Sequence, residues 1–330
     1  MSARPLVSIC VPAFNAARWI HGALESALAQ TYEEFELVVS DNASTDETAE
    51  IARGFGDPRV RVETAARTVG PVQNHNRAIR LSRGAFVKFL HADDLLRPQC
   101  LEEMVELALE DDRIGLVFAP RDVLLEQATD PEWAELFARP HERFSRLERV
   151  NEGRDLFGQL LDAGFAENWI GEPSAVLLRR SALERVGLLN ERTTQLADLE
   201  LWGRIMVGHR VGFVDRVLSV YRHHGASGTA ENARVHRDWL DLPWLLEGLL
   251  GIPDLTDDER ARLLRLRRAA MRRALRAQAG RLLRRNPSGE LPAYLAYRLR
   301  AAVGRAPVLV PALDGSSKRT DSLAQTTRVR

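Results

Sequence analysis

VSICVPAFN (residues 7–15) and FELVVSDNASTD (residues 35–46) are the stretches that decide the fold. In each, a run of apolar residues ends in polar ones. Val7–Val11 is closed by Pro12, and Phe35–Val39 is followed by Ser40 and Asp41. Short apolar runs of this kind predict strands that are buried on both faces. Such strands are typical of parallel sheets that carry helices on both sides.

Helical and strand patterns alternate along the first third of the chain. The spacing predicts helices at 16–30, 44–54, 72–81 and 98–110, and further strands at 60–62, 85–90 and 114–118. Ser44, with Glu47 three residues later, predicts a capping box at the start of the second helix. The alternation predicts an α/β fold with a mostly parallel, doubly wound sheet. Ligands of such sheets bind outside the carboxyl ends of the strands, where Asp41, Asp93 and Asp94 lie.

The remainder of the chain predicts a less regular second half and a helical extension. Residues 121–168 predict irregular helices over the sheet, with Trp133, Phe137, Phe144 and Leu147 as apolar anchors. Later patterns predict strands at 174–178, 211–214 and 218–221, and helices at 181–186 and 199–207. Three parts result: a domain at 1–235, a Leu-, Ala- and Arg-rich helical extension at 236–313, and a polar tail at 314–330 that we expect to be disordered.

Composition excludes several classes of protein. The 330 residues carry a formal net charge of zero, so the total charge does not indicate nucleic-acid binding. Cys10 and Cys100 form no CxxC motif, so we expect neither a disulfide framework nor a structural zinc site, as in a reducing cytosol. No apolar run approaches the roughly 20 residues of a membrane-spanning helix. We therefore expect a cytoplasmic protein.

Asp93 and Asp94 are adjacent carboxylates at a predicted strand end. Their mutual repulsion would be relieved by a hard divalent cation such as Mg²⁺ or Mn²⁺, which also binds phosphate oxygens. The alternative is that they cap the helix that begins near Pro98. Asp41 lies at the tip of the second strand, where it could accept a hydrogen bond from a base N–H, although the residues after it also suit a polar turn.

Several segments, in this order, resemble family-2 glycosyltransferases with the GT-A fold: residues 7–15, 26–31, 35–46 and 84–94, with Pro98 following. The resemblance covers about residues 5–230. It implies a nucleotide-sugar half at about 1–118 and an acceptor half at about 119–235. The implied reaction is metal-dependent sugar transfer from a nucleotide-diphosphate donor to a saccharide or lipid-linked acceptor, with inversion. Bacterial cell-surface polysaccharide or glycolipid synthesis is the implied setting.

The resemblance also implies roles for individual residues: Pro12, Ala13 and Asn15 in the nucleotide pocket, Asp41 on the base, Asp93 on the ribose or the metal, and Asp94 on the metal. The sequence departs from the usual pattern at His91, where Asp is common. It departs again at His75, where Arg is common. Arg77 is then a substitute for the diphosphate contact that the Arg would make.

Asp198 is the predicted catalytic base. The segment Asp198–Arg204 resembles the acceptor-side segment of the family, whose Asp removes a proton from the acceptor hydroxyl, although the preceding acid is replaced by Ala197. The alternative is a helix cap. Residues 221–227 resemble a YRxHxxS segment, which implies His224 as a metal or diphosphate contact rather than an ordinary loop histidine. Glu172 is either a ligand of sugar hydroxyls or a loop acid.

Residues 260–285 contain eleven Arg and no acidic residue. Leu263, Leu264, Ala270, Met271, Ala274, Leu275 and Leu282 would form one face of a helix there. Such a helix would either lie on an anionic membrane, making the protein peripheral, or pack on the catalytic domain.

Two other functions compete with sugar transfer. A nucleotidyltransferase would need a Gly-rich phosphate loop with a Lys after the first strand, and the segment after Val11 has neither. A non-catalytic nucleotide-sugar-binding protein is compatible with the departures at His91 and Ala197.

Overall fold

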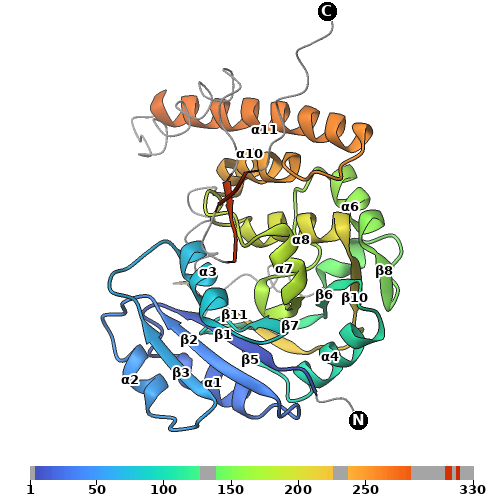
Figure 1. Ribbon diagram of the computed structural model, residues 1–330. Helices are drawn as coiled ribbons and strands as arrows, with labels where there is room; N and C mark the ends of the chain where they lie inside the picture. The colour runs from blue at the N-terminus through green and yellow to red at the C-terminus, as the bar shows by residue number, and fades with distance from the viewer. Residues whose placement is uncertain (1–3, 127–138, 226–236, 284–308, 314–316, 320–330) are drawn as a thin grey trace, which may run out of the picture.

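The computed structural model describes residues 4–126, 139–225, 237–283, 309–313 and 317–319. An eight-stranded sheet forms its centre, in the order β3-β2-β1-β4-β9-β6-β10-β8 (Figure 1). Its strands are β1 (Val7–Ala13), β2 (Phe35–Asp41), β3 (Val60–Thr64), β4 (Phe86–Phe89), β6 (Ile114–Phe118), β8 (Val150–Glu152), β9 (Val176–Arg179) and β10 (Arg210–Phe213). The first four in that order are parallel, whereas β9 is antiparallel to both of its neighbours. The predicted mostly parallel α/β sheet is confirmed.

Helices cover both faces of this sheet (Figure 1). They are α1 (Ile20–Leu28), α2 (Thr48–Arg53), α3 (Pro71–Leu81), α4 (Cys100–Glu110), α6 (Gly153–Asp162), α7 (Arg180–Val186) and α8 (Ala197–Gly208). Two separate hydrophobic clusters result, and successive residues of β1 belong to different ones: Ile9 and Val11 pack with α1 and α4, whereas Cys10 packs with α3 and α8. Because strand side chains alternate between faces, a strand buried on both sides reads as one continuous apolar run.

A smaller sheet, β5-β11-β7, joins distant parts of the chain. It consists of β5 (Leu95–Leu96), β7 (Arg121–Leu125) and β11 (Ser219–His223), with Val220 paired to Leu95. The prediction of only irregular helices at 121–168 was wrong, because β7 and β8 lie there beside α6 and a 3₁₀ turn at Pro140–Arg143. These short strands owe their pairing to distant partners. Phe144 is buried in the core as expected, whereas Trp133 and Phe137 lie outside the described residues.

The predicted capping box at Ser44 is also wrong. α2 begins at Thr48, and the Ser44 hydroxyl instead accepts the backbone N–H of Asn15 at 3.0 Å. Asp46 accepts the N–H groups of Ala17 and Thr48, both at 3.1 Å. The polar turn after β2 therefore fastens the loop after β1, and Asp46 rather than Ser44 supports the start of α2.

The extension is α10 (Arg237–Leu250) followed by α11 (Asp257–Leu283). α10 packs on α8, and its Leu245, Leu246 and Leu249 join the same cluster as Trp202. Leu263 and Ala274 of α11 are fully buried, and Arg267 pairs with Glu247 of α10. Much of the apolar face predicted at 260–285 is thus covered by the protein itself. Among the described residues, no helix is long and apolar enough to span a bilayer.

A short hairpin follows the extension. It pairs β12 (Leu309–Pro311) with β13 (Ser317–Arg319), and Leu188 donates its N–H to the Pro311 carbonyl at 2.8 Å. Residues 317–319 of the predicted disordered tail are therefore a strand, and the rest of 314–330 lies outside the described residues.

Arg204 offers a test of how the second half is stabilised. Its guanidinium pairs with Glu200 at 2.8 Å and donates to the carbonyls of Val186 and Leu188, both at 2.6 Å, with its side chain only 3% exposed. We expect Arg204→Met to lower the free energy of unfolding by about 3–5 kcal/mol, because Glu200 would remain as an unpaired buried charge. Urea denaturation measures this. Arg146→Ala removes an exposed ion pair with Glu148 and should leave the free energy of unfolding almost unchanged. Equal losses of stability in the two variants would contradict a stabilising role for the buried Arg204–Glu200 pair.

Candidate functional site

The polar residues predicted to bind a nucleotide lie at the carboxyl ends of β1 and β2. The register pairs Pro12 with Ser40 and Ala13 with Asp41, so these residues are direct neighbours. Asn15 joins them because its side-chain oxygen accepts the Thr45 N–H at 2.8 Å. Asp41 is 1% exposed; one carboxylate oxygen accepts the Ser44 N–H at 3.3 Å. The other is buried and has no hydrogen-bond partner among the described residues.

Asp93 and Asp94 follow β4 in a tight turn, in which the Asp94 N–H donates to the His91 carbonyl at 3.0 Å. The backbone N–H of Arg222 donates to Asp94 Oδ1 at 2.9 Å, and its side chain donates to the Asp93 carbonyl at 2.7 Å. β11 carries Arg222 to this point by pairing with β5. Within the described part of the chain, Asp94 Oδ2 is buried without a hydrogen-bond partner.

His224 lies on the other side of Asp93. Its Nε2 is 3.0 Å from Asp93 Oδ2, and its ring stacks on Trp19 with centroids 4.1 Å apart. The predicted metal residues Asp93, Asp94 and His224 thus form one cluster, and His91 belongs to it as well. Single ligand atoms of His91, Asp93 and Asp94 all lie within 4.8 Å of one another.

The charges of this cluster are poorly compensated by protein alone. Burial raises the pKa of Asp94 well above its ordinary value, and the neighbouring charges of Asp93 and Glu172 add to the effect. Burial also acts on Asp93, but the hydrogen bond from His224 brings its pKa below the ordinary value. Asp93 therefore has a partner that offsets its charge, whereas Asp94 Oδ2 has none. A divalent cation would bind such carboxylate oxygens and relieve their repulsion.

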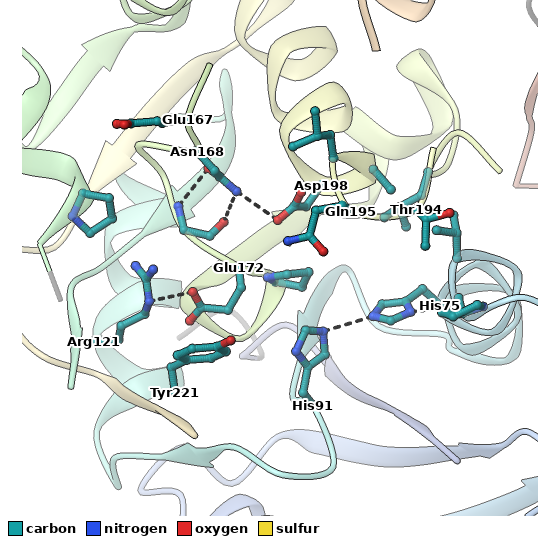
Figure 2. A pocket seen from close by; sticks show the side chains of 18 of the residues that line it. His75, His91, Arg121, Glu167, Asn168, Glu172, Thr194, Gln195, Asp198 and Tyr221 are labelled. Carbon is teal, nitrogen blue, oxygen red and sulfur yellow. Dashed lines mark hydrogen bonds and ion pairs between the residues drawn. The ribbon is translucent and has the colours of Figure 1, made fainter. Parts of the chain in front are cut away.

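A cavity of about 410 Å³ adjoins this cluster, and Figure 2 shows it from close by. His91 reaches it from the cluster, and Asp198 reaches it from the first turn of α8. Asp198 accepts hydrogen bonds from the Asn168 side chain at 2.9 Å and from the Leu199 N–H at 2.7 Å. Burial raises its pKa to about 7 despite these bonds. A carboxyl group that titrates near neutrality suits general-base chemistry.

The backbone that carries Asp198 is held from the extension. Asp241 of α10 is 1% exposed, and its carboxylate accepts the N–H groups of Thr194 at 2.6 Å and Gln195 at 2.5 Å. Thr194 and Gln195 themselves line the cavity. The extension is therefore part of the support of the site.

Glu172 lines the same cavity as Asp198 and His91 (Figure 2). Arg121, at the start of β7, binds its Oε2 at 2.6 Å with a side chain that is 3% exposed. Glu172 Oε1 is buried and finds no hydrogen-bond partner in the described ranges. A carboxylate that is fixed at one oxygen and unsatisfied at the other suits a hydroxyl ligand.

Arg77 and Glu200 have structural contacts. The Arg77 guanidinium donates to the Ser40 hydroxyl at 2.7 Å and to the Glu63 carbonyl at 2.9 Å, so it lies beside the end of β2 and does not line the cavity. Its predicted diphosphate contact stays a prediction. Glu200 pairs with Arg204 at 2.8 Å.

Sequence reasoning missed several supporting residues. Asn168, Arg121 and Asp241 carry no local motif, because each acts on a segment far away in the chain. Arg222 did stand in the segment that resembled YRxHxxS, and its position there was the available signal.

A family model for glycosyl transferase family 2 matches residues 8–187, more than half of the chain. The chain belongs to this family. An uncharacterized protein of Mycobacterium tuberculosis (strain CDC 1551 / Oshkosh) is 37% identical over 248 residues, which is 74% of this chain and 76% of that protein. Chondroitin synthase of Escherichia coli is 38% identical over 117 residues, 35% of this chain and 16% of that protein.

Solved structures of two transferases share the fold. S. aureus TarS 1–349, in complex with UDP-GlcNAc, superposes with a TM-score of 0.59 at 17% identity, covering 79% of this chain and 70% of that one. The mannosyltransferase PcManGT of Pyrobaculum calidifontis, in complex with GDP-Man and Mn²⁺, gives 0.52 at 21% identity, covering 92% and 82%. The GT-A fold is confirmed, and the protein is a glycosyltransferase rather than a nucleotidyltransferase.

The raised pKa of Asp198 makes stability depend on pH. An ionised Asp198 is disfavoured in the folded protein, so its contribution to stability falls as pH rises from its ordinary pKa near 3.8 to about 7. The free energy of unfolding of Asp198→Asn, minus that of the parent, should therefore increase as pH rises through this range. Above pH 7 the difference should stay constant. Urea denaturation of both proteins from pH 4 to 8, without metal, measures the difference. A difference that does not vary with pH would contradict the shift.

Proposed function

We propose that this glycosyltransferase moves a sugar from a nucleoside-diphosphate donor to an acceptor hydroxyl with inversion, and that Asp198 is the general base. The observation that carries the proposal is the shared cavity. Asp198, Glu172 and His91 all line this cavity, and His91 also belongs to the acidic cluster of Asp93 and Asp94. A base and a leaving-group site around one cavity suit a single displacement.

The donor would lie along the carboxyl ends of β1, β2 and β4. Asp41 offers a buried carboxylate oxygen without a partner among the described residues, which suits a base N–H. Pro12, Ala13 and Asn15 would form the adjacent wall. Relatives in fold bind UDP-GlcNAc and GDP-Man, which supports a nucleotide-sugar donor of one of these kinds.

Asp93 and Asp94 would hold a divalent cation, Mn²⁺ or Mg²⁺, with His224 beside Asp93. The fit rests on the unsatisfied buried Asp94 Oδ2 and on the repulsion that raises the pKa of that carboxyl. A bound cation would stabilise the negative charge of the departing diphosphate. Mn²⁺ in the mannosyltransferase complex is consistent with this choice.

Asp198 would remove the proton of the acceptor hydroxyl as the hydroxyl oxygen attacks the anomeric carbon. Asn168 orients its carboxylate through Oδ2, and the Leu199 N–H fixes Oδ1. Attack from the face opposite the diphosphate inverts the anomeric centre. No second carboxylate is needed as a nucleophile, because the base and the leaving group act in one step.

Relatives support a proposal for the class of acceptor. Chondroitin synthase and a succinoglycan biosynthesis protein match part of this chain, so we infer a role in polysaccharide or glycolipid assembly at the cell surface. The acceptor would then be a saccharide or a lipid-linked saccharide.

Asp198→Asn separates catalysis from donor binding. We expect the rate of transfer to fall by about 10²–10⁴, the usual contribution of a general base. The rise in melting temperature caused by UDP-GlcNAc or GDP-Man with Mn²⁺ should persist, because Asp198 does not contact the cation cluster. Asp94→Asn is the matched variant and should lose the Mn²⁺-dependent part of that rise. Full activity in Asp198→Asn would exclude it as the base, and an inactive parent with every donor would favour a binding protein.

We also propose that α11 binds anionic membranes through electrostatic attraction. Arg265, Arg268, Arg272 and Arg276 of α11 are exposed, while its apolar residues Leu263 and Ala274 are buried. Each arginine near an anionic surface contributes about 1 kcal/mol.

Co-sedimentation with phosphatidylserine vesicles should therefore occur at low salt and disappear at high salt. Replacing these four arginines by Gln should weaken binding by at least tenfold. Equal binding to neutral vesicles, or unchanged binding of the substituted protein, would contradict this contact.

A further inference from the structure

His75 and His91, two of the positions at which the sequence departs from the pattern it otherwise resembles, touch each other. Their Nε2 atoms lie 3.1 Å apart, although the residues come from α3 and from the turn after β4. A contact at this distance between ring nitrogens requires one donor and one acceptor. The surroundings of the pair determine which is which.

The carbonyl of Pro71 fixes the tautomer of His75. His75 Nδ1 lies 2.9 Å from this oxygen, which can only accept, so Nδ1 carries the proton. In a neutral ring that carries its proton on Nδ1, Nε2 is the acceptor. His91 must then donate from its own Nε2.

A neutral His91 that donates from Nε2 has a lone pair at Nδ1. The lone pair faces Asp94, because His91 Nδ1 and Asp94 Oδ2 lie 3.6 Å apart. Asp94 Oδ2 has no hydrogen-bond partner within the described segments. When Asp94 is ionised, an imidazole lone pair and a carboxylate oxygen therefore face each other, and both are available to a cation.

We infer that His91 Nδ1 and Asp94 Oδ2 are ligands of one divalent cation, and that His75 is a positioning residue for His91. Two ligand atoms each about 2.1 Å from a cation lie about 3.0–3.4 Å apart, close to the spacing found here. The chain from His91 through His75 to the Pro71 carbonyl is the kind of outer support that metal-bound imidazoles have. This inference rests on the cation of the proposed function.

An imidazole ligand changes which cation the site prefers. Mg²⁺ favours oxygen ligands, whereas imidazole nitrogen suits transition metals, and affinity rises from Mn²⁺ to Co²⁺. The replacement of Asp by His at position 91 therefore biases this enzyme against Mg²⁺. His75 belongs to the same change, because the arginine usual at that position would repel a cation and could not accept the His91 proton.

Electron spin-echo spectroscopy of bound Mn²⁺ tests the nitrogen ligand directly. The full-length protein is loaded with Mn²⁺ alone, and with Mn²⁺ and UDP or GDP. We expect ¹⁴N coupling of a bound imidazole in the parent and in His224→Gln, and its loss in His91→Asp. The Mg²⁺ concentration that displaces Mn²⁺ should be lower for His91→Asp than for the parent. Circular dichroism of each variant verifies the fold.

The positioning role has its own readout. His75→Leu should weaken Mn²⁺ binding by about 10–100-fold while leaving the ¹⁴N coupling of the residual complex. His75→Gln should restore much of the affinity, since its side-chain oxygen can accept the His91 proton. Equal affinities of the two variants would overturn this role.

The outcomes separate the two proposals. Bound Mn²⁺ that is weakened by Asp94→Asn but has no His91-dependent ¹⁴N coupling would overturn the inference and leave the proposed function intact. Coupling that persists in His91→Asp and disappears in His224→Gln would give the ligand role to His224 instead. No bound Mn²⁺ under any condition would overturn the cation of the proposed function together with this inference.

Discussion

Four carboxyl groups lie in or beside one cavity and repel one another. The other residues of the site have to offset this repulsion. Asp93, Asp94, Glu172 and Asp198 are all at least partly buried. Removing such charges from water costs several kcal/mol each unless partners replace the solvent. His224 partners Asp93, and Arg121 partners Glu172. Asp94 and Asp198 keep raised pKa values, which is typical of carboxyl groups with a role in binding or catalysis.

The two hydrophobic clusters explain how the fold tolerates this concentration of charge. One cluster covers each face of the central strands of the large sheet, and this packing supports those strands. The small sheet then adds β11 beside β5, and its backbone supplies an N–H to Asp94. On the other side of the cavity, Asp241 in the extension holds the loop that leads into α8. Residues far apart in sequence therefore fix the acidic cluster and the base separately.

The contact between His75 and His91 changes the meaning of two departures from the family. Considered separately, His75 and His91 each replace a charged residue of the pattern that the sequence resembles, and each replacement removes an expected contact to the metal or the diphosphate. In the fold they are one hydrogen-bonded pair whose far end is a backbone carbonyl. The pair leaves a nitrogen lone pair beside Asp94, so the departures are compatible with a cation site of altered composition.

The sequence by itself determined the parallel half of the fold and the residues at its ligand edge. β1 and β2 were predictable because burial on both faces leaves a continuous apolar run, and Asp41, Asp93 and Asp94 follow such runs directly. Only the tertiary structure decided that β5, β7 and β11 form a second sheet, that Ser44 fastens a loop rather than a helix, and that Asp241 supports Asp198. The spacing of apolar residues indicates which side chains of one segment are buried, and so it predicts single helices and strands. Hydrogen bonds and ion pairs between distant segments leave no such periodic record.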